Sequence, residues 1–257
     1  MNWDPMPSSD SASEHVSDDS LATSDDSDAL GLSDIRFRLG TRLVRASGST
    51  IDGSSHVLRL RLKPSLIAGL LGVFVGLLPR PVQSWAETRW PEWFLPRAIT
   101  LKMKRKDGWD EEFENEARNY PKLRELQDSV IPAYYGLVLL CGKKPVPALV
   151  LSDVGGHELY QPEAGAIPTD QLAGLLRPAF EALARCGIDH GDLKLDNLHL
   201  VRDNGRLRVM VVDFESAEDI VDPANSAFFV DSNIDHILRI YRNHQECLIE
   251  DGLLPKP

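Results

Sequence analysis

Cysteine is scarce in this sequence, with only three among 257 residues. Cys141, Cys186 and Cys247 lie far apart, and their spacing matches neither a metal-binding motif nor a disulfide framework. Such sparse usage favours a reducing compartment. The chain also begins without the positively charged and then apolar pattern of a secretory signal. We therefore expect a cytoplasmic or nuclear protein.

Long apolar segments are missing as well. Segment 65–79 carries no charge, but it contains three glycines, ends in Pro79 and is shorter than the roughly 20 residues that a membrane helix needs. Buried strands are therefore favoured here, and a membrane-attached interaction protein is the alternative. Gly69, Gly72 and Gly76 would either let these strands bend and pack closely or cover the phosphates of a ligand.

Basic residues are absent from residues 1–34, which contain nine acidic residues and many serines. A segment with so few large apolar residues cannot bury enough surface to offset its loss of conformational entropy, so disorder is expected. This acidic tail is either a phosphorylation target or a solvated leader without a specific role. The rest of the chain carries only −2 of the total net charge of −11, which gives no support for a nucleic-acid partner.

The sequence does contain a dense group of polar residues between positions 188 and 215. Asp192, Lys194 and Asn197 lie close together, and Asp213 follows the apolar run 207–212. Phosphoryl transfer requires groups of these kinds: a carboxylate to orient or deprotonate the acceptor hydroxyl, a cation near the transferred phosphate, and oxygen ligands for Mg²⁺. Asp192 and Lys194 are the catalytic candidates, and Asn197 and Asp213 are the candidate metal ligands.

The pattern His-x-Asp-Leu-Lys-x-x-Asn at residues 190–197, with Asp-Phe at 213–214, resembles the catalytic and metal-binding loops of the protein-kinase-like superfamily. The resemblance implies an α+β structure, a bilobal protein-kinase-like fold with a β-rich N-lobe and a truncated, mainly helical C-lobe. The N-lobe would span residues 35–152 and the minimal C-lobe residues 153–257. ATP and Mg²⁺ are the implied cofactors, and His190 would hold the loop through a backbone bond or packing.

Strand patterns dominate the first half of the chain. Residues 35–39 and 58–62 alternate between apolar residues and arginine, which indicates half-buried strands. Residues 98–104 alternate too and place Lys102 and Lys104 on one face. The resemblance selects Lys102 over Lys104 as the lysine that binds ATP.

A helix is predicted over residues 109–127, and Glu116 lies within its apolar stripe. A buried carboxylate is costly unless it is paired, so we expect Glu116 to pair with Lys102 rather than to reach water at the edge of the stripe. Further along, the resemblance implies that backbone groups of Ser152, Asp153 and Val154 contact the adenine ring.

The second half of the chain predicts helices around a hairpin. Strands at 198–201 and 207–212, joined by a turn at Asn204-Gly205, would bring Asn197 and Asp213 together. A helix over 170–186, capped by Thr169, precedes this hairpin, and a last helix follows a capping box that begins at Ser232. Residues 80–97, with three tryptophans, are expected to form a loop that lies on the body of the protein.

Two departures from the protein-kinase pattern bear on function. Gly191 stands where regulated kinases have arginine, and Glu215 replaces the glycine after Asp-Phe. In these respects the chain is similar in part to aminoglycoside and choline phosphotransferases, while its short C-lobe, with no Ala-Pro-Glu-like motif after Asp213, resembles short kinase-like open reading frames of fungi. We predict a Mg²⁺-ATP-dependent phosphotransferase that moves the γ-phosphate to a hydroxyl of a protein Ser/Thr or a small alcohol. The alternative is a pseudokinase that binds nucleotides or other proteins, and no membrane partner is expected.

Overall fold

The computed structural model describes residues 32–51, 54–105, 108–141 and 145–255. Residues 1–31 of the acidic tail lie outside these ranges. The first described strand begins at Leu32. Within the described ranges, no helix combines the length and the apolar character that a bilayer crossing requires.

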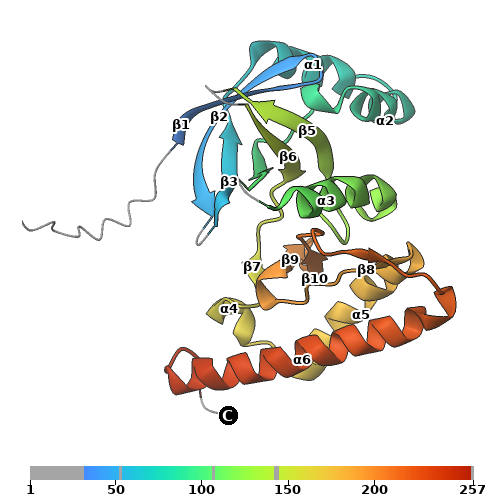
Figure 1. The fold of residues 1–257 in the computed structure, drawn as a ribbon. Helices are drawn as coiled ribbons and strands as arrows, with labels where there is room; N and C mark the ends of the chain where they lie inside the picture. Colours follow the sequence, from blue (N-terminus) through green and yellow to red (C-terminus); the bar gives the residue numbers. More distant parts are fainter. Residues whose placement is uncertain (1–31, 52–53, 106–107, 142–144, 256–257) are drawn as a thin grey trace, which may run out of the picture.

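Six antiparallel strands form a barrel in the order β1-β2-β3-β4-β6-β5 (Figure 1). Their bounds are β1 Leu32–Leu39, β2 Arg42–Ile51, β3 Ser54–Leu62, β4 Ala98–Met103, β5 Tyr134–Leu140 and β6 Val146–Ser152. Because side chains alternate between the two faces of a strand, the apolar positions turn inward: Phe37 lies opposite Val44, and Leu60 lies opposite Ile99. All four are buried, and the strands expected from the arginine alternation are confirmed.

The barrel closes where β1 meets β5. Phe37 pairs with Leu140, and the Cys141 N–H donates a hydrogen bond to the Arg36 carbonyl at 2.9 Å. The expected α+β bilobal protein-kinase-like fold is therefore wrong, because the structure is a closed six-stranded barrel with helices added to it. Alternation along a strand reveals which face is buried but not which distant strand pairs with it, so the sequence pattern could not predict this closure.

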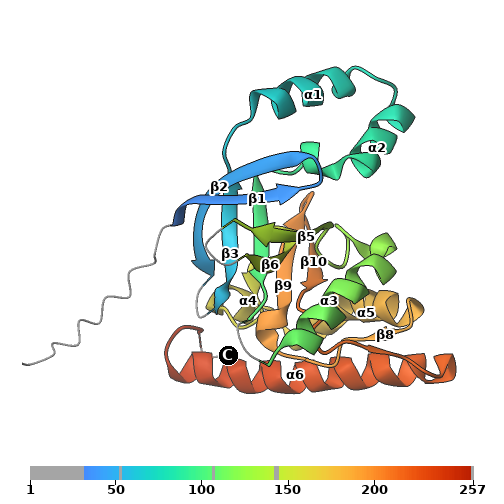
Figure 2. The same ribbon diagram turned by 45° about the horizontal axis from the view of Figure 1, so that its top comes forward.

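Segment 65–79 forms a helix and not the expected buried strands. Helix α1, Leu66–Gly76, is followed by α2, Arg80–Arg89, and a 3-10 turn at Pro91–Trp93. The Ser65 hydroxyl caps α1 by accepting from the Ala68 N–H, and Pro79 precedes the first turn of α2. Residues 80–97 are therefore largely helical, and the expected loop is wrong. Figure 2 shows that α1 and α2 stand away from the barrel.

Helix α3, Asp110–Lys122, lies directly below the barrel in Figure 1. It is shorter than the predicted helix over 109–127, because Pro121 occupies its last turn and a 3-10 turn at Arg124–Leu126 follows. Its buried positions include Phe113, Glu116 and Tyr120, which confirms the predicted stripe. The helix therefore contacts the barrel and the later elements at once.

The elements after the barrel build a helical layer with two small sheets. Their bounds are β7 His157–Glu158, α4 Pro162–Gly165, α5 Thr169–Arg185, β8 Ile188–Asp189, β9 Leu198–Asp203, β10 Arg206–Val211, β11 Glu218–Asp219 and α6 Ser226–Glu250. The sheet orders are β10-β9-β7 and β11-β8. The β9–β10 hairpin turns at Asn204-Gly205, where both residues have positive φ, as predicted.

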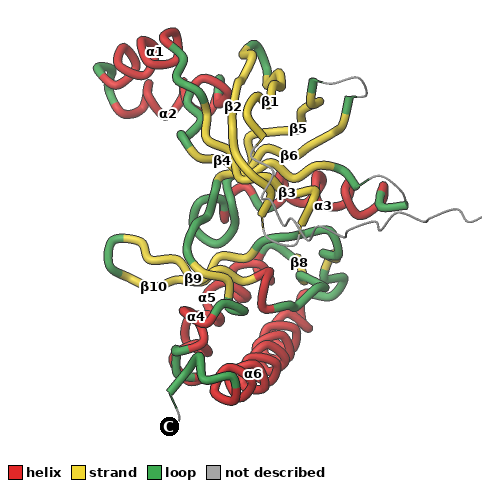
Figure 3. The backbone as a smooth tube through the Cα atoms, turned by 90° about the vertical axis from the view of Figure 1, so that its left-hand side faces the viewer, coloured by secondary structure: helices red, strands yellow, loops and turns green. Residues whose placement is uncertain are grey.

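Helices α5 and α6 pack against each other beneath the hairpin (Figure 3). The predicted apolar faces are buried, including Leu176 and Phe180 of α5 and Ile237 and Tyr241 of α6. The Tyr241 hydroxyl donates to the Ala164 carbonyl at 2.7 Å and so fixes α6 to α4. Two predicted starts were wrong: Pro168 and not Thr169 stands at the cap of α5, and α6 begins at Ser226 and not near Ser232.

Candidate functional site

One cleft of about 940 Å³ runs between the barrel and the β9–β10 hairpin. The residues predicted to act in catalysis, metal binding or ATP binding line it: Lys102, Glu116, Ser152, Asp153, Val154, Asp192, Lys194, Asn197 and Asp213. They come from a barrel strand, a helix, the segment after β6, and the loops on both sides of the hairpin. The structure thus brings these distant residues together, while their chemical roles remain predictions.

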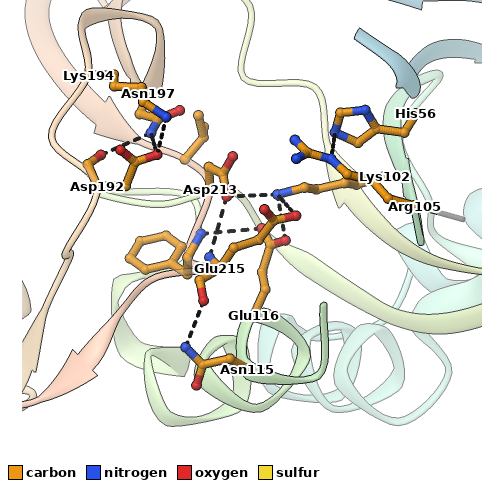
Figure 4. Close-up of polar contacts among 12 residues, drawn as sticks. His56, Lys102, Arg105, Asn115, Glu116, Asp192, Lys194, Asn197, Asp213 and Glu215 are labelled. Carbon is orange, nitrogen blue, oxygen red and sulfur yellow. Dashed lines mark hydrogen bonds and ion pairs between the residues drawn. The ribbon is translucent and has the colours of Figure 1, made fainter. Parts of the chain in front are cut away.

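Lys102 is the centre of the charged network in this cleft (Figure 4). Its Nζ lies 2.7 Å from Glu116 Oε2, 2.8 Å from Asp213 Oδ1 and 3.0 Å from Glu215 Oε1. The Lys102–Glu116 pair expected from the sequence is confirmed. The third carboxylate, from Glu215, was not expected there. Three carboxylates around one ammonium give the network a negative net charge, which suits a cationic ligand next to it.

Burial and these charges shift the pKa values of the network in different directions. Burial alone would lower the pKa of Lys102, but the carboxylates, Glu116 first, outweigh it and raise this pKa above its ordinary value. Burial raises the pKa of Glu116 to about 7 against the opposing effect of Lys102. Burial also acts to raise the pKa of Asp213, but Lys102 outweighs it and lowers that pKa. Lys102 and Asp213 are therefore both charged at neutral pH.

Helix α3 positions one side of this network. Glu116 is fully buried, and its Oε1 accepts from the Phe214 N–H at 3.4 Å. The neighbouring Asn115 donates through Nδ2 to the Glu215 carbonyl at 2.9 Å and to the Ala217 carbonyl at 2.8 Å. One turn of α3 therefore fixes the backbone from residue 214 to residue 217. Sequence spacing predicted the carboxylate but not the adjacent amide.

The loop after β8 holds Asp192, Lys194 and Asn197 together. Lys194 Nζ lies 2.8 Å from Asp192 Oδ2, and Asn197 Nδ2 donates to the Asp192 carbonyl at 3.0 Å and to Oδ2 at 3.2 Å. Gly191 has φ of +76°, and a Cβ there would lie 2.1 Å from the Ser216 carbonyl oxygen. Only glycine fits at this point, which explains why arginine does not stand there.

The backbone around Asp213 is strained and tied to the same loop. Asp213 adopts φ of +66°, a conformation that non-glycine residues keep only where the surroundings impose it, often at functional sites. The preceding Val212 donates its N–H to the Asn197 carbonyl at 3.0 Å, and its carbonyl lies 2.9 Å from His190 Nε2. The expectation that His190 holds the loop through a backbone bond is confirmed.

The oxygen atoms available in this cleft fit a magnesium ion. Among the described residues, Asp213 Oδ2 and Asn197 Oδ1 have no hydrogen-bond partner, while the other polar atom of each side chain is engaged. A carboxylate oxygen and an amide oxygen are ligands that Mg²⁺ favours. The carboxylates of Glu116, Asp213 and Glu215 lie within 4.8 Å of one another, and each of them already pairs with the Lys102 ammonium.

The segment after β6 forms the far wall of the cleft. The Ser152 N–H donates to the Ala133 carbonyl at 2.9 Å, so it is engaged within the protein. Asp153 uses its side chain to pair with Arg59 at 3.2 Å. Val154 makes no hydrogen bond within the described residues, so its backbone is available to a ligand. Of the three residues predicted to contact adenine, Ser152 therefore has its backbone N–H engaged, whereas Val154 keeps its backbone groups available.

Among the side chains of the cleft that sequence reasoning missed are His56 of β3 and Arg105 beyond β4. Arg105 Nε lies 3.1 Å from His56 Nε2. The available signal was the position of Arg105 just past the strand that carries Lys102. By contrast, Gly69, Gly72 and Gly76 lie on α1, where a Cβ added to any of them would meet no atom within 4 Å, and none of them lines the cleft. They do not cover a ligand there.

Comparison with known proteins gives a partial likeness to a fungal protein. No protein-family model matches the chain. The meiotic driver SPOK2 of Podospora anserina is 33% identical over 107 residues, which cover 40% of this chain and 13% of that protein. The chain therefore matches only a small part of this much longer relative. The likeness does not assign the chain to a family.

Proposed function

We propose that this protein is a Mg²⁺-ATP-dependent phosphotransferase that moves the γ-phosphate of ATP to a hydroxyl group. The observation that carries the proposal is the convergence of Asp192, Asn197 and Asp213 on one cleft, with Asp213 in a strained backbone conformation. The proposal rests on these side chains and their motif, and not on the architecture of the barrel.

Each residue has a role that its contacts support. Asp192 is the group that orients or deprotonates the acceptor hydroxyl, since Lys194 and Asn197 engage its Oδ2 and its Oδ1 has no partner among the described residues. Lys194 is mostly exposed and offsets negative charge on the transferred phosphoryl group. Asn197 and Asp213 would hold Mg²⁺, which neutralises the charge of the phosphates when bound. The acceptor is a protein Ser/Thr or a small alcohol.

Lys102 contributes in two ways to this proposed reaction. Its ammonium keeps the pKa of Asp213 low, so that this carboxylate is charged and able to bind a cation. Its pair with Glu116 fixes the lysine at the base of the cleft, where a nucleotide phosphate can approach it. Val154, on the far wall, offers backbone groups to the adenine ring.

Thermal melting with and without Mg²⁺-ATP tests the proposal. A ligand at 100 times its dissociation constant stabilises by about 2.7 kcal/mol, which raises Tm by several degrees in a protein of this size. We expect that rise for the natural protein and its loss in Asp213→Asn. We also expect transfer of labelled γ-phosphate, to the protein itself or to added hydroxyl compounds, and its abolition in the same variant.

The matched control is Asp203→Asn, which changes an exposed carboxylate near the hairpin turn whose partner Arg208 lies 3.9 Å away. This variant should keep the melting shift and the transfer. Full transfer by Asp213→Asn would refute the proposed function.

A nucleotide-binding module without transfer activity is the second candidate. It is favoured by the position of Gly69, Gly72 and Gly76 on α1, away from the cleft, because phosphotransferases of this motif class cover the phosphates with a glycine-rich turn. A melting shift with Mg²⁺-ATP that Asp213→Asn abolishes, with no labelled phosphate on any acceptor, would favour this candidate.

A further inference from the structure

Four cationic side chains line the cleft: Arg59, Lys102, Arg105 and Lys194. Three of them are paired with carboxylates, namely Arg59 with Asp153, Lys102 with its three acidic neighbours, and Lys194 with Asp192. Arg105 has no carboxylate partner within the described part of the chain. Among the described residues, it is therefore the Lys or Arg of the cleft whose charge no carboxylate balances.

Arg105 is nevertheless held in place. Its Nε donates to His56 Nε2 at 3.1 Å, and its guanidinium carbon lies 4.5 Å from the centre of the Trp109 ring. Both terminal nitrogens lack a partner among the described residues. Figure 4 shows the guanidinium beside Lys102 and turned toward the space in front of Asp213. A fixed guanidinium with free terminal nitrogens is suited to a planar or branched oxyanion.

The course of β4 indicates which part of a nucleotide would reach Arg105. Ile99 pairs with Ser152 next to the far wall of the cleft, and Lys102 lies three residues further along the strand. Arg105 lies three residues beyond Lys102. Arg105 follows the end of β4 at Met103, on the side of Lys102 that faces away from Ile99 and the wall assigned to adenine. A nucleotide with adenine at that wall would extend its phosphates past Lys102 toward Arg105, and the terminal phosphate is the last of them.

We propose that Arg105 binds the terminal phosphate of the nucleotide and that His56 positions its guanidinium; this inference rests on the proposed function. The protein thereby recognises a triphosphate with an arginine at the end of β4. Burial lowers the pKa of His56, and the positive charges of Arg105 and Lys102 lower it further, while the carboxylates of Glu215 and Asp213 oppose this shift. The ring is therefore neutral, and its Nε2 accepts the hydrogen bond from Arg105 Nε–H. Arg105 is a binding residue, and His56 acts through it.

Binding of Mg²⁺-ATP and Mg²⁺-ADP to Arg105→Gln tests the assignment by calorimetry on the full chain. Loss of charge-assisted hydrogen bonds should weaken ATP binding by about tenfold or more. ADP binding should change by less than about threefold on the same scale. The control, Lys104→Gln, removes a neighbouring cation that pairs with Asp110 at 2.7 Å and does not line the cleft; it should bind both nucleotides as the natural protein does.

His56 is tested by the ratio of ATP to ADP affinity, which a purely structural role would not change. His56→Ala should lower this ratio in the same direction as Arg105→Gln, and His56→Gln should restore it, because its amide oxygen can accept in place of Nε2. An unchanged ratio in Arg105→Gln, or equal losses for ATP and ADP, would overturn the inference and leave the proposed function standing. Absence of any nucleotide binding by the natural protein would remove both.

Discussion

The cleft and the α1–α2 hairpin (residues 66–89) differ in which side chains they bury and which they expose to solvent. In the cleft, Lys102 and Glu116 are almost completely buried, at 5% and 0% exposure, and each has charged partners. In the hairpin, Leu70 and Phe74 are 72% and 65% exposed, and the buried positions of the two helices are Val75 and Ala86. Charge lies inside one region, and apolar surface lies outside in the other.

This difference shows which interactions in each region contribute to the free energy of unfolding. A buried ion is tolerated only when partners compensate its loss of hydration, so each charge of the cleft depends on the others. An exposed leucine contributes little to the free energy of unfolding, because most of its apolar surface is already in contact with water in the folded protein. The cleft should therefore respond strongly to single substitutions, and the exposed face of α1 should not.

Lys102→Met should have the largest effect of the changes considered. It leaves three carboxylates within 4.8 Å of one another without their cation, and removal of one partner from a buried pair costs about 3–5 kcal/mol. Urea unfolding measures the change. Lys104→Met is the matched control, because its partner Asp110 is 70% exposed, and it should cost less than about 1 kcal/mol. Equal costs for the two variants would contradict the contrast.

Leucine truncation separates the barrel from the hairpin. Leu60→Ala removes a fully buried side chain of β3 and should cost about 2–5 kcal/mol. Leu70→Ala removes a side chain that is 72% exposed and should change the free energy of unfolding by less than about 0.5 kcal/mol. Urea unfolding of both variants checks the pair. A large loss in Leu70→Ala would mean that the exposed face of α1 is covered in solution.

A smaller effect is expected from pH through His199. Burial lowers its pKa, although the Gly155 carbonyl opposes this shift. Below the ordinary pKa of about 6.5, the unfolded chain binds a proton that the folded protein does not, so stability falls as pH decreases. The loss of unfolding free energy between pH 7.5 and 5.5 should be about 1 kcal/mol smaller in His199→Asn than in the natural protein, because the variant lacks this titration. His56 and His190, whose pKa values are also lowered, remain in both proteins.

A loss of equal size in the two proteins would show that His199 does not contribute. Asparagine is chosen because its amide nitrogen can donate to the Gly155 carbonyl in place of Nδ1. The comparison therefore changes the titration while keeping the hydrogen bond.

Local patterns predicted much of the secondary structure and the members of the site. Strand alternation predicted β1, β3 and β4, and the turn residues Asn204-Gly205 predicted the β9–β10 hairpin. Helical spacing predicted that Glu116 faces inward. These features depend on residues close together in the chain, so the sequence contains their signal directly. The spacing of polar residues after β8 likewise selected side chains that now line one cleft.

The errors concern properties that local patterns do not encode. Segment 65–79 is uncharged, and we inferred burial from that composition, yet it is an exposed helix. The closure between β1 and β5 depends on partners far apart in the chain. Arg105 escaped prediction for a related reason, since its partner His56 comes from another strand. Tertiary pairing, and not residue type, decides each of these cases.

The way the barrel closes also orders its assembly during synthesis. When β4 has left the ribosome, strands β1 to β4 can pair as an open sheet whose two outer strands still lack neighbours. The next two strands form a hairpin of their own, with β5 taking its place beside β1 and β6 beside β4. The β5–β6 hairpin thus pairs with both edge strands of the open sheet. Until residue 152 has emerged, these edges are unpaired and can form incorrect strand pairs.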